Sequence, residues 1–275
     1  MIAEKSGKFG KIIDFHVHAF PDKVADRAIE VLYTINKMKP VYDGTISGLI
    51  SLIEQEGVDF AVIQPVATKA SQVKGINDFA ASHTDPRILS FGGMHPEWND
   101  PAAEIERMIS LGIPGIKIHA NWQGVYADDP IMFPIYEAAQ GRLIITFHAG
   151  EEPTPFDPQR ATPERLRIVH ENFPNLTINA AHMGGWMMWD ECEEHLIGRD
   201  LYLDTSACFR EYMPDGRMLS MIRRHGADHI LFATDLPLAR PSAEAQRLME
   251  LGLTDNELEL ILYRNAERLL GERVL

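Results

Sequence analysis

The chain has 275 residues, 45% of them hydrophobic, so it is long enough to bury one large core. Lys and Arg number 26 against 40 Asp and Glu, and the net charge of -14 disfavours binding to nucleic-acid phosphates or to anionic membranes. No apolar run approaches the length of a membrane span, and residues 1–7 lack the apolar core of a secretory signal. We therefore expect a cytoplasmic protein that acts on a small molecule, without nucleic-acid or membrane partners.

Short apolar, β-branched runs alternate with longer amphipathic stretches, a pattern typical of repeated βα units and a parallel sheet. In chain order, we expect strands at residues 11–17, 58–64, 88–94, 114–119, 142–148, 176–182, 200–205 and 229–235, each followed by a helix. Helical stretches at residues 22–37 and 45–56 make the first connection unusually long. The predicted fold class is therefore α/β, a (β/α)8 TIM barrel of one domain over residues 1–275, with a helical insertion after strand 1.

Several of these strands end in a residue that can bind a metal. These residues are His16 and His18, His119, His148, His182 and Asp235. The carboxyl ends of the strands of a parallel barrel meet on one face, so ligands far apart in sequence can surround a single ion. The two cysteines, Cys192 and Cys208, have no metal-like spacing, so the site would use imidazole and carboxylate, which suit zinc, manganese or iron.

Alternate residues of a strand share a face, so Asp14, His16 and His18 point the same way. The two imidazoles can therefore bind one ion. His148 and Asp235 are candidates to complete this ligand set. Asp235 is the predicted general acid/base, and His182 could polarise a carbonyl or hold developing oxyanion charge. Asp14 lies deeper, where it either orients one of the imidazoles or pairs with a donor on the barrel floor.

The motifs that carry these residues resemble the amidohydrolase superfamily. They are Asp14-Phe15-His16-Val17-His18, Phe147-His148-Ala149-Gly150, Ala181-His182-Met183-Gly184-Gly185 and Ala233-Thr234-Asp235. The most similar branch is amidohydrolase-2, which contains aminocarboxymuconate semialdehyde decarboxylase, resorcylate decarboxylases and lactonases. The resemblance covers nearly the whole chain. It implies that one divalent ion, zinc first and manganese or iron otherwise, is held by His16, His18, His148 and Asp235. It also implies that His182 contacts the substrate or a metal-bound water. A homodimer is a further implication of the resemblance.

Lys117 and His119 share a face of the fourth predicted strand, and two interpretations of them stay open. The run Gly115–Trp122 resembles the stretch of urease-like and dihydroorotase-like members in which a carboxylated lysine bridges two metals, so Lys117 and His119 could belong to a second metal site. The favoured interpretation is a single ion, with a charged Lys117 that binds a substrate carboxylate.

Three further features carry weaker signals. His95 falls at the end of the third predicted strand and could contact substrate. Arg210 follows the seventh strand and could pair with a substrate carboxylate, although a solvated loop arginine is the simpler interpretation. The cluster Trp186-Met187-Met188-Trp189 could form one wall of a pocket for an apolar or aromatic substrate. It could equally serve helix packing or a dimer contact, and we rank helix packing first.

The leading functional hypothesis is metal-dependent hydrolysis of a lactone, amide or ester. Metal-activated water attacks the substrate, and Asp235 acts as the general acid/base. The alternative is a metal-dependent nonoxidative decarboxylase of an aromatic or muconate-like carboxylic acid. A noncatalytic metal-binding or ligand-binding barrel is the third hypothesis.

Overall fold

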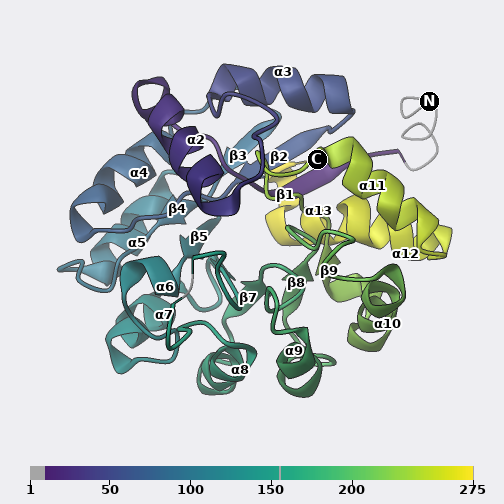
Figure 1. Ribbon diagram of the computed structural model, residues 1–275. Coiled ribbons are helices and arrows are strands. Elements are labelled where there is room, and N and C mark those ends of the chain that lie inside the picture. Colours follow the sequence, from purple (N-terminus) through teal and green to yellow (C-terminus); the bar gives the residue numbers. More distant parts are fainter. Residues whose placement is uncertain (1–9, 155, 275) are drawn as a thin grey trace. The chain divides into compact units, whose positions relative to one another are not determined.

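The computed structural model describes residues 10–154 and 156–274 (Figure 1). The chain divides into two compact units. The first comprises Met1–Ile63, Thr84–Leu89 and Asp204–Leu275, and the second comprises Gln64–His83 and Ser90–Leu203. The expectation of a single domain stays a prediction.

The first unit is built around strand β1 (Ile13–Val17). It pairs in parallel with β2 (Phe60–Ile63), and β3 (Ile88–Ser90) follows in the same order. The chain beyond β9 (Ile230–Leu231) runs along the other side of β1, where the amide of Phe15 donates to the carbonyl of Phe232 at 2.9 Å. Every residue of β1 is buried, so its polar side chains need partners inside the protein.

Helices α2 (Asp22–Asn36) and α3 (Ile46–Glu56) lie between β1 and β2, which confirms the predicted insertion. Helix α3 begins where the Thr45 hydroxyl accepts from the amide of Gly48 at 2.9 Å. It ends at Gly57, whose φ of 72° is the left-handed conformation that glycine adopts without strain. The remaining helices of this unit are α10 (Asp215–His225), α11 (Pro241–Glu250), α12 (Asp255–Glu259) and α13 (Asn265–Leu270), with a π-helical turn at Leu260–Arg264.

The second unit contains consecutive parallel strands that lie side by side. They are β4 (Gly92–Gly93), β5 (Gly115–Ile118), β6 (Ile144–Phe147) and β7 (Thr177–Ala180), followed by β8 (Tyr202–Asp204), whose last residue belongs to the first unit. Ile118 lies opposite Phe147, and Phe147 lies opposite Ala180. The carboxyl ends of these strands are therefore level, and the residues that follow them emerge at one edge.

Helices connect the strands of the second unit. They are α4 (Val73–Ala80), α5 (Pro101–Ser110), the short α6 (Ala120–Gln123), α7 (Phe133–Ala139), α8 (Pro163–Asn172) and α9 (Trp189–His195). A buried polar network joins three elements: the Asn77 amide donates to Glu104 at 2.7 Å and accepts from the backbone of Gly93 at 2.9 Å. Arg107 completes it with contacts of 2.9 and 2.6 Å to the Glu104 carboxylate.

All eight predicted strands have counterparts, and the alternation with helices is as expected. One difference concerns residues 88–94, predicted as one strand and found as β3 and β4. A Cβ atom on Gly92 would lie 2.4 Å from the Met108 side chain and 2.5 Å from Asn77, so the chain needs glycine where it passes these neighbours.

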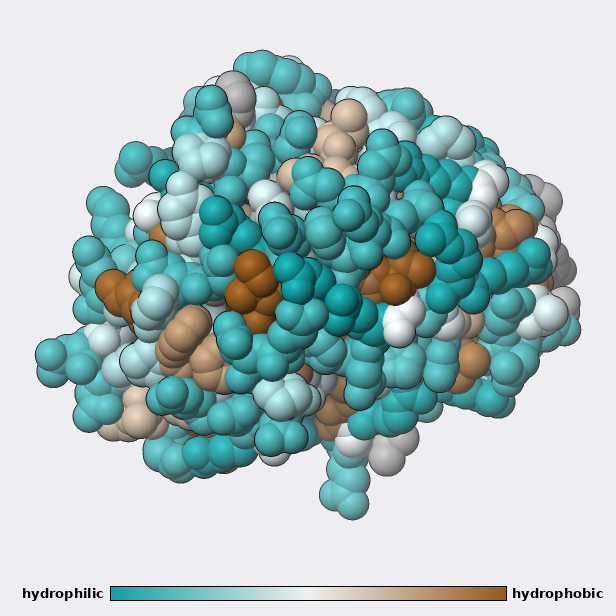
Figure 2. Space-filling model, turned by 90° about the horizontal axis from the view of Figure 1, so that it is seen from below, coloured by the Kyte–Doolittle hydropathy of each residue, from teal (hydrophilic) through white to brown (hydrophobic). Residues whose placement is uncertain are grey.

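The visible face of the surface is mainly hydrophilic, with hydrophobic side chains in separate small patches (Figure 2). Within residues 10–154 and 156–274, no helix has the length and apolar character needed to cross a membrane.

Candidate metal centre

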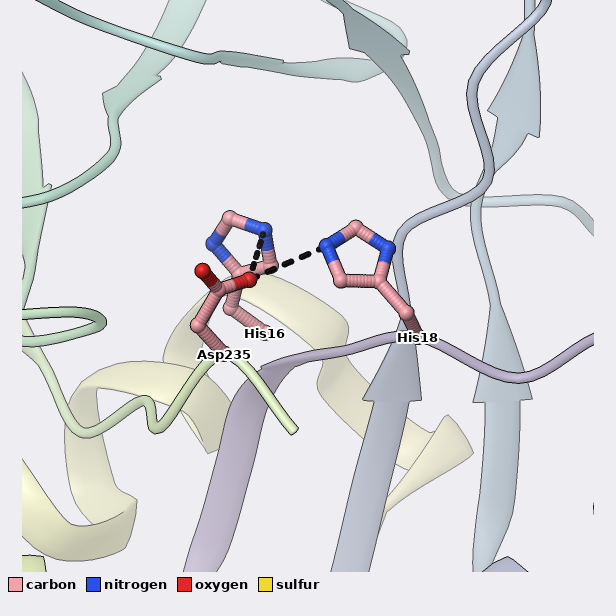
Figure 3. Close-up of side chains that lie close together, drawn as sticks. All are labelled: His16, His18 and Asp235. Carbon is pink, nitrogen blue, oxygen red and sulfur yellow. Dashed lines mark hydrogen bonds and ion pairs between the residues drawn. The ribbon is translucent and has the colours of Figure 1, made fainter. Parts of the chain in front are cut away.

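His16, His18 and Asp235 come together in the first unit (Figure 3). His16 lies in β1, His18 follows its carboxyl end, and the Asp235 amide donates to the His16 carbonyl at 2.9 Å. The Asp235 Oδ1 atom lies 3.0 Å from His18 Nε2 and 3.6 Å from His16 Nε2. The backbone pairing of β1 with the segment beyond β9 thus gathers residues that are more than 200 positions apart in sequence.

The imidazole of His16 is held from behind by residues that the sequence analysis missed. Its Nδ1 atom lies 3.2 Å from Oδ2 of Asp204 and 3.1 Å from Oγ of Ser206, and the Ser206 hydroxyl also hydrogen-bonds to Asp204. Asp204 is fully buried at the end of β8. A carboxylate behind one ring nitrogen fixes the ring and makes the other nitrogen a better metal ligand. A signal was available in the sequence, because Asp204 lies one residue before the end of the strand predicted at residues 200–205.

Asp14 pairs with Thr234 rather than with an imidazole. Its carboxylate accepts from the Thr234 hydroxyl at 2.5 Å, from the Thr234 amide at 3.1 Å and from the His16 amide at 3.3 Å. Of the two interpretations left open, the structure favours the buried residue paired with a donor. Burial raises the pKa of Asp14 to about 7, although these hydrogen bonds act to lower it.

Both predicted catalytic residues have left-handed backbone conformations. The φ angle is 61° at His182 and 62° at Asp235. Such angles are uncommon outside glycine, although aspartate and histidine adopt them more readily than most residues, and they store strain that the surrounding structure must hold. They occur where the chain turns sharply after a strand.

A second cluster lies in the second unit, beyond the ends of β5, β6 and β7. The Oε1 atom of Glu152 lies 3.1 Å from His119 Nε2 and 2.9 Å from His148 Nε2. His148 Nε2 also lies 3.0 Å from the Glu151 carbonyl, and His148 Nδ1 lies 3.0 Å from His182 Nε2. A carbonyl can only accept, so neutral His148 carries its proton on Nε2, and its Nδ1 accepts from His182.

Three groups of this cluster, His119, His148 and Glu152, lie close enough together to suggest a cation site. The rings of His119 and His148 argue against it, because they are stacked 4.2 Å apart with planes within 8° of each other. An ion binds an imidazole in the plane of the ring, and two nearly parallel, separated planes cannot share one ion in that way. In this arrangement the cluster is held by contacts to Glu152.

The structure leaves several predicted roles as predictions. His148, the fourth predicted ligand, belongs to the second unit, as do Lys117 and His119. Lys117 is buried on β5. Burial lowers the pKa of His148, but Glu152 and the Glu151 carbonyl raise it above its ordinary value, and the charge of Lys117 opposes them.

The weaker signals have separate outcomes. Arg210 contacts Asp215 at 3.0 Å and Glu250 at 3.3 Å on the surface, so carboxylates of the chain itself hold its guanidinium. His95 is buried in the second unit. Trp189 is also buried, and its indole donates to the His182 carbonyl at 3.0 Å, so it packs and supports the turn at His182.

The donor set of the first unit fits a divalent ion. It combines two imidazoles with one carboxylate, the ligands that zinc, manganese and iron accept. The ligand atoms lie within 4.8 Å of one another, and Asp204 and Ser206 engage His16 through Nδ1, which leaves Nε2 on the side of Asp235.

This fold and this set of ligand atoms define a class of protein, the metal-using enzymes of the α/β type. The sequence profile of a family described as amidohydrolase matches residues 13–271, and the chain belongs to this family. A comparison with curated proteins finds no matching sequence.

Solved structures with a similar fold include a 5-carboxyvanillate decarboxylase from Sphingomonas paucimobilis, with 17% sequence identity, a TM-score of 0.71, and coverage of 94% of this chain and 98% of the other. An uncharacterized TIM-barrel protein from Bordetella bronchiseptica has 18% identity, a TM-score of 0.73, and coverage of 96% and 99%. A dihydroxybenzoic acid decarboxylase from Polaromonas sp. JS666, solved with bound manganese and an inhibitor, has 19% identity, a TM-score of 0.69, and coverage of 94% and 96%.

The family match and these likenesses confirm several expectations. The fold class is α/β of the TIM-barrel type. The protein is a metal-dependent enzyme of the amidohydrolase superfamily.

Proposed function

We propose that the protein is a metal-dependent nonoxidative decarboxylase of a small aromatic carboxylic acid. The observation that carries the proposal is the cluster of His16, His18 and Asp235 in a chain of the amidohydrolase family. The names of similarly folded proteins, a carboxyvanillate decarboxylase and a dihydroxybenzoic acid decarboxylase, support this reaction over the hydrolysis that we placed first from sequence alone.

Aromatic side chains beyond the ends of β5 and β6 support an aromatic substrate. Trp122 is 38% exposed, and its ring lies edge-on to His119 and to Phe156, with centroids 5.9 Å away in each case. Residues at the carboxyl ends of parallel strands form the active sites of βα folds. An exposed indole there offers a flat apolar face to a substrate ring.

In the proposed reaction, the bond between the ring carbon and the carboxyl carbon breaks, CO2 leaves, and the ring carbon gains one proton. No oxidant is consumed. Asp235 or His182, in its protonated form, is the residue that we assign to deliver this proton. A divalent ion held by His16, His18 and Asp235 would supply Lewis-acid chemistry toward the oxygens of the substrate. Asp204 and Ser206 keep the His16 ring in place.

Manganese is the first ion to test, because the dihydroxybenzoic acid decarboxylase was solved with manganese bound, and zinc is the second. His148 stays the predicted fourth ligand. A second ion with a carboxylated Lys117, a homodimer and a cytoplasmic location are also predictions. An added mass of one CO2 on Lys117, together with more than one tightly bound ion per chain, would establish the two-ion alternative.

Hydrolysis of a lactone, amide or ester is the second candidate function. The observation that favours it is the position of the Asp235 carboxylate beside two imidazoles, because a carboxylate next to metal-activated water can take a proton from it.

One experiment separates the two reactions. Manganese-loaded and zinc-loaded protein is incubated in D2O with 2,6-dihydroxybenzoate, with 5-carboxyvanillate and with a panel of lactones and esters. Decarboxylation gives equimolar CO2 and a product with one deuterium on the vacated carbon, whereas hydrolysis gives ring-opened or cleaved products without CO2. Asp235→Asn should lower the active reaction by at least about 100-fold. The exposed Asp26→Asn is the matched control. Turnover of esters or lactones alone would overturn the decarboxylase proposal.

A further inference from the structure

The second unit contains a cavity of about 510 Å³ that has no role in the proposed reaction. Its lining includes Thr68, Lys69, His95, Gln123, Tyr126 and Ile131. The volume falls within the roughly 300–1,000 Å³ of pockets that hold small molecules. The cavity lies beyond the carboxyl ends of β4 and β5, where the loops of a βα fold form binding sites.

The wall of the cavity is fixed by Gln123. Its amide donates to the carbonyl of Ala67 at 2.9 Å and to that of Met94 at 2.6 Å, and its oxygen accepts from the amide of His119 at 3.1 Å. One buried side chain thus joins the segments that follow three different strands. A wall tied in this way needs little rearrangement to receive a ligand.

His95 presents a hydrogen-bond donor whose position is defined. Its side chain is 6% exposed, and its Nδ1 atom accepts from the backbone amide of Glu97 at 3.2 Å. A backbone amide can only donate, so the neutral ring carries its proton on Nε2. Among the described residues, Nε2 has no hydrogen-bond partner. Burial lowers the pKa of His95, so the ring stays neutral near pH 7.

Lys69 supplies the positive charge of the lining. Its backbone is fixed by the Gln72 side chain, which accepts from the Lys69 amide at 3.0 Å, and its ammonium has no ion pair among the described residues. Two carboxylates, those of Asp129 and Glu97, also line the cavity. Asp129 accepts from the amide of Ile131 at 3.0 Å, and the Glu97 side chain is 74% exposed and lies on the Nδ1 side of His95, 4.0 Å away.

We propose that this cavity binds a small organic acid, whose carboxylate is held by the Lys69 ammonium and the Nε2–H group of His95. The apolar part of the ligand lies against Val125, Tyr126 and Ile131. A charge-assisted hydrogen bond from lysine and a neutral one from imidazole together select an anion over its uncharged analogue. The site requires neither the metal nor turnover, so it goes beyond the proposed function.

The test uses benzoate as the probe and benzamide as its neutral analogue, with binding measured by calorimetry on full-length protein. The measurement is made on the native enzyme and on Asp235→Asn, which removes a ligand of the metal centre but leaves the cavity intact. Benzoate should bind both proteins, and benzamide should bind at least about tenfold more weakly.

Variants assign the binding to the cavity. Lys69→Met should weaken benzoate binding about tenfold, whereas Lys74→Met, an exposed lysine on α4 outside the lining, should leave it unchanged. His95→Gln, which keeps an N–H donor, should bind more tightly than His95→Phe, and thermal melts establish that both are folded. Crystals soaked with 4-bromobenzoate should show the bromine anomalous peak inside the cavity.

Equal affinity of Lys69→Met and the parent protein, equal affinity for benzoate and benzamide, or a bromine peak elsewhere would each overturn the proposal. These outcomes are independent of the reaction. If benzoate binding depends on Lys69 but no CO2 is released from any substrate, only the proposed function fails.

Discussion

The Asp204 carboxylate and the His16 imidazole meet at 3.2 Å inside the first unit, and both side chains are almost completely buried. The contact uses Nδ1 of His16, so Nε2 is the nitrogen on the side of Asp235. We therefore infer that Asp204 orients the ring of His16, a predicted metal ligand.

Replacing Asp204 should weaken the metal site through this orientation. We expect Asp204→Asn to lower the affinity for manganese and zinc by about 10- to 100-fold, because the amide holds the ring less firmly and makes Nε2 a weaker ligand. Competition with a chelating dye measures the affinity. The exposed Asp200→Asn is the control, and an unchanged affinity in Asp204→Asn would show that His16 needs no such support.

The hydrogen bonds of the second cluster fix two histidine tautomers. With the Glu151 carbonyl as acceptor, His148 should carry its proton on Nε2, and His182 should donate from Nε2 to Nδ1 of His148. Two-dimensional ¹⁵N spectra of labelled protein report this pattern directly. Glu152→Gln should preserve it, because the backbone carbonyl remains. A proton found on Nδ1 of His148 would contradict the arrangement.

Trp122 should act on substrate binding rather than on the chemical step. We expect Trp122→Ala to raise KM for the aromatic acid about fivefold while kcat changes much less, because a ring-to-ring contact contributes about 1 kcal/mol. Trp122→Phe should retain most of the affinity. Steady-state kinetics with the active substrate test this expectation, and a fall in kcat at constant KM would place Trp122 in a different role.

Glu104 should make the stability of the second unit depend on pH. Burial acts to raise the pKa of Glu104, but the hydrogen bonds from Arg107 and Asn77 outweigh it and hold the pKa below its ordinary value. The stabilisation is therefore complete above the unfolded pKa of about 4.3 and is lost as the pH falls through the folded pKa.

Glu104→Gln should accordingly lower the free energy of unfolding by about 2 kcal/mol at pH 7, with a smaller difference toward pH 3. Urea titrations at several pH values measure it. Glu106→Gln, which removes an exposed partner of Arg142 from the same helix, should have little effect at any pH. Equal destabilisation by both substitutions would contradict the role given to the buried network.

The positions of the strands could be read from the sequence because each one is an apolar run ended by a turn. The same rule placed His16, His18 and Asp235 at strand ends, and their meeting follows from the pairing of the segment beyond β9 with β1. A short apolar run bounded by turn residues marks a strand directly, whereas the pairing of distant strands follows from the fold.

The partners of these residues could not be predicted, because they depend on side-chain packing. Asp14 shares a face with two histidines, yet its carboxylate accepts a hydrogen bond from the Thr234 hydroxyl. Asp204 carries no motif, and only the fold brings it behind His16. His148 stays a predicted ligand, and the contacts of its ring nitrogens with Glu151, Glu152 and His182 could not be foreseen from the sequence.

The most direct measurement locates the metal itself. Crystals of the full chain grown with manganese should show an anomalous peak within about 2.0–2.3 Å of Nε2 of His16, Nε2 of His18 and a carboxylate oxygen of Asp235, and Asp235→Asn should lose most of that peak. A tightly bound ion located away from the two imidazoles, or an Asp235→Asn variant with an unchanged peak, would contradict the account.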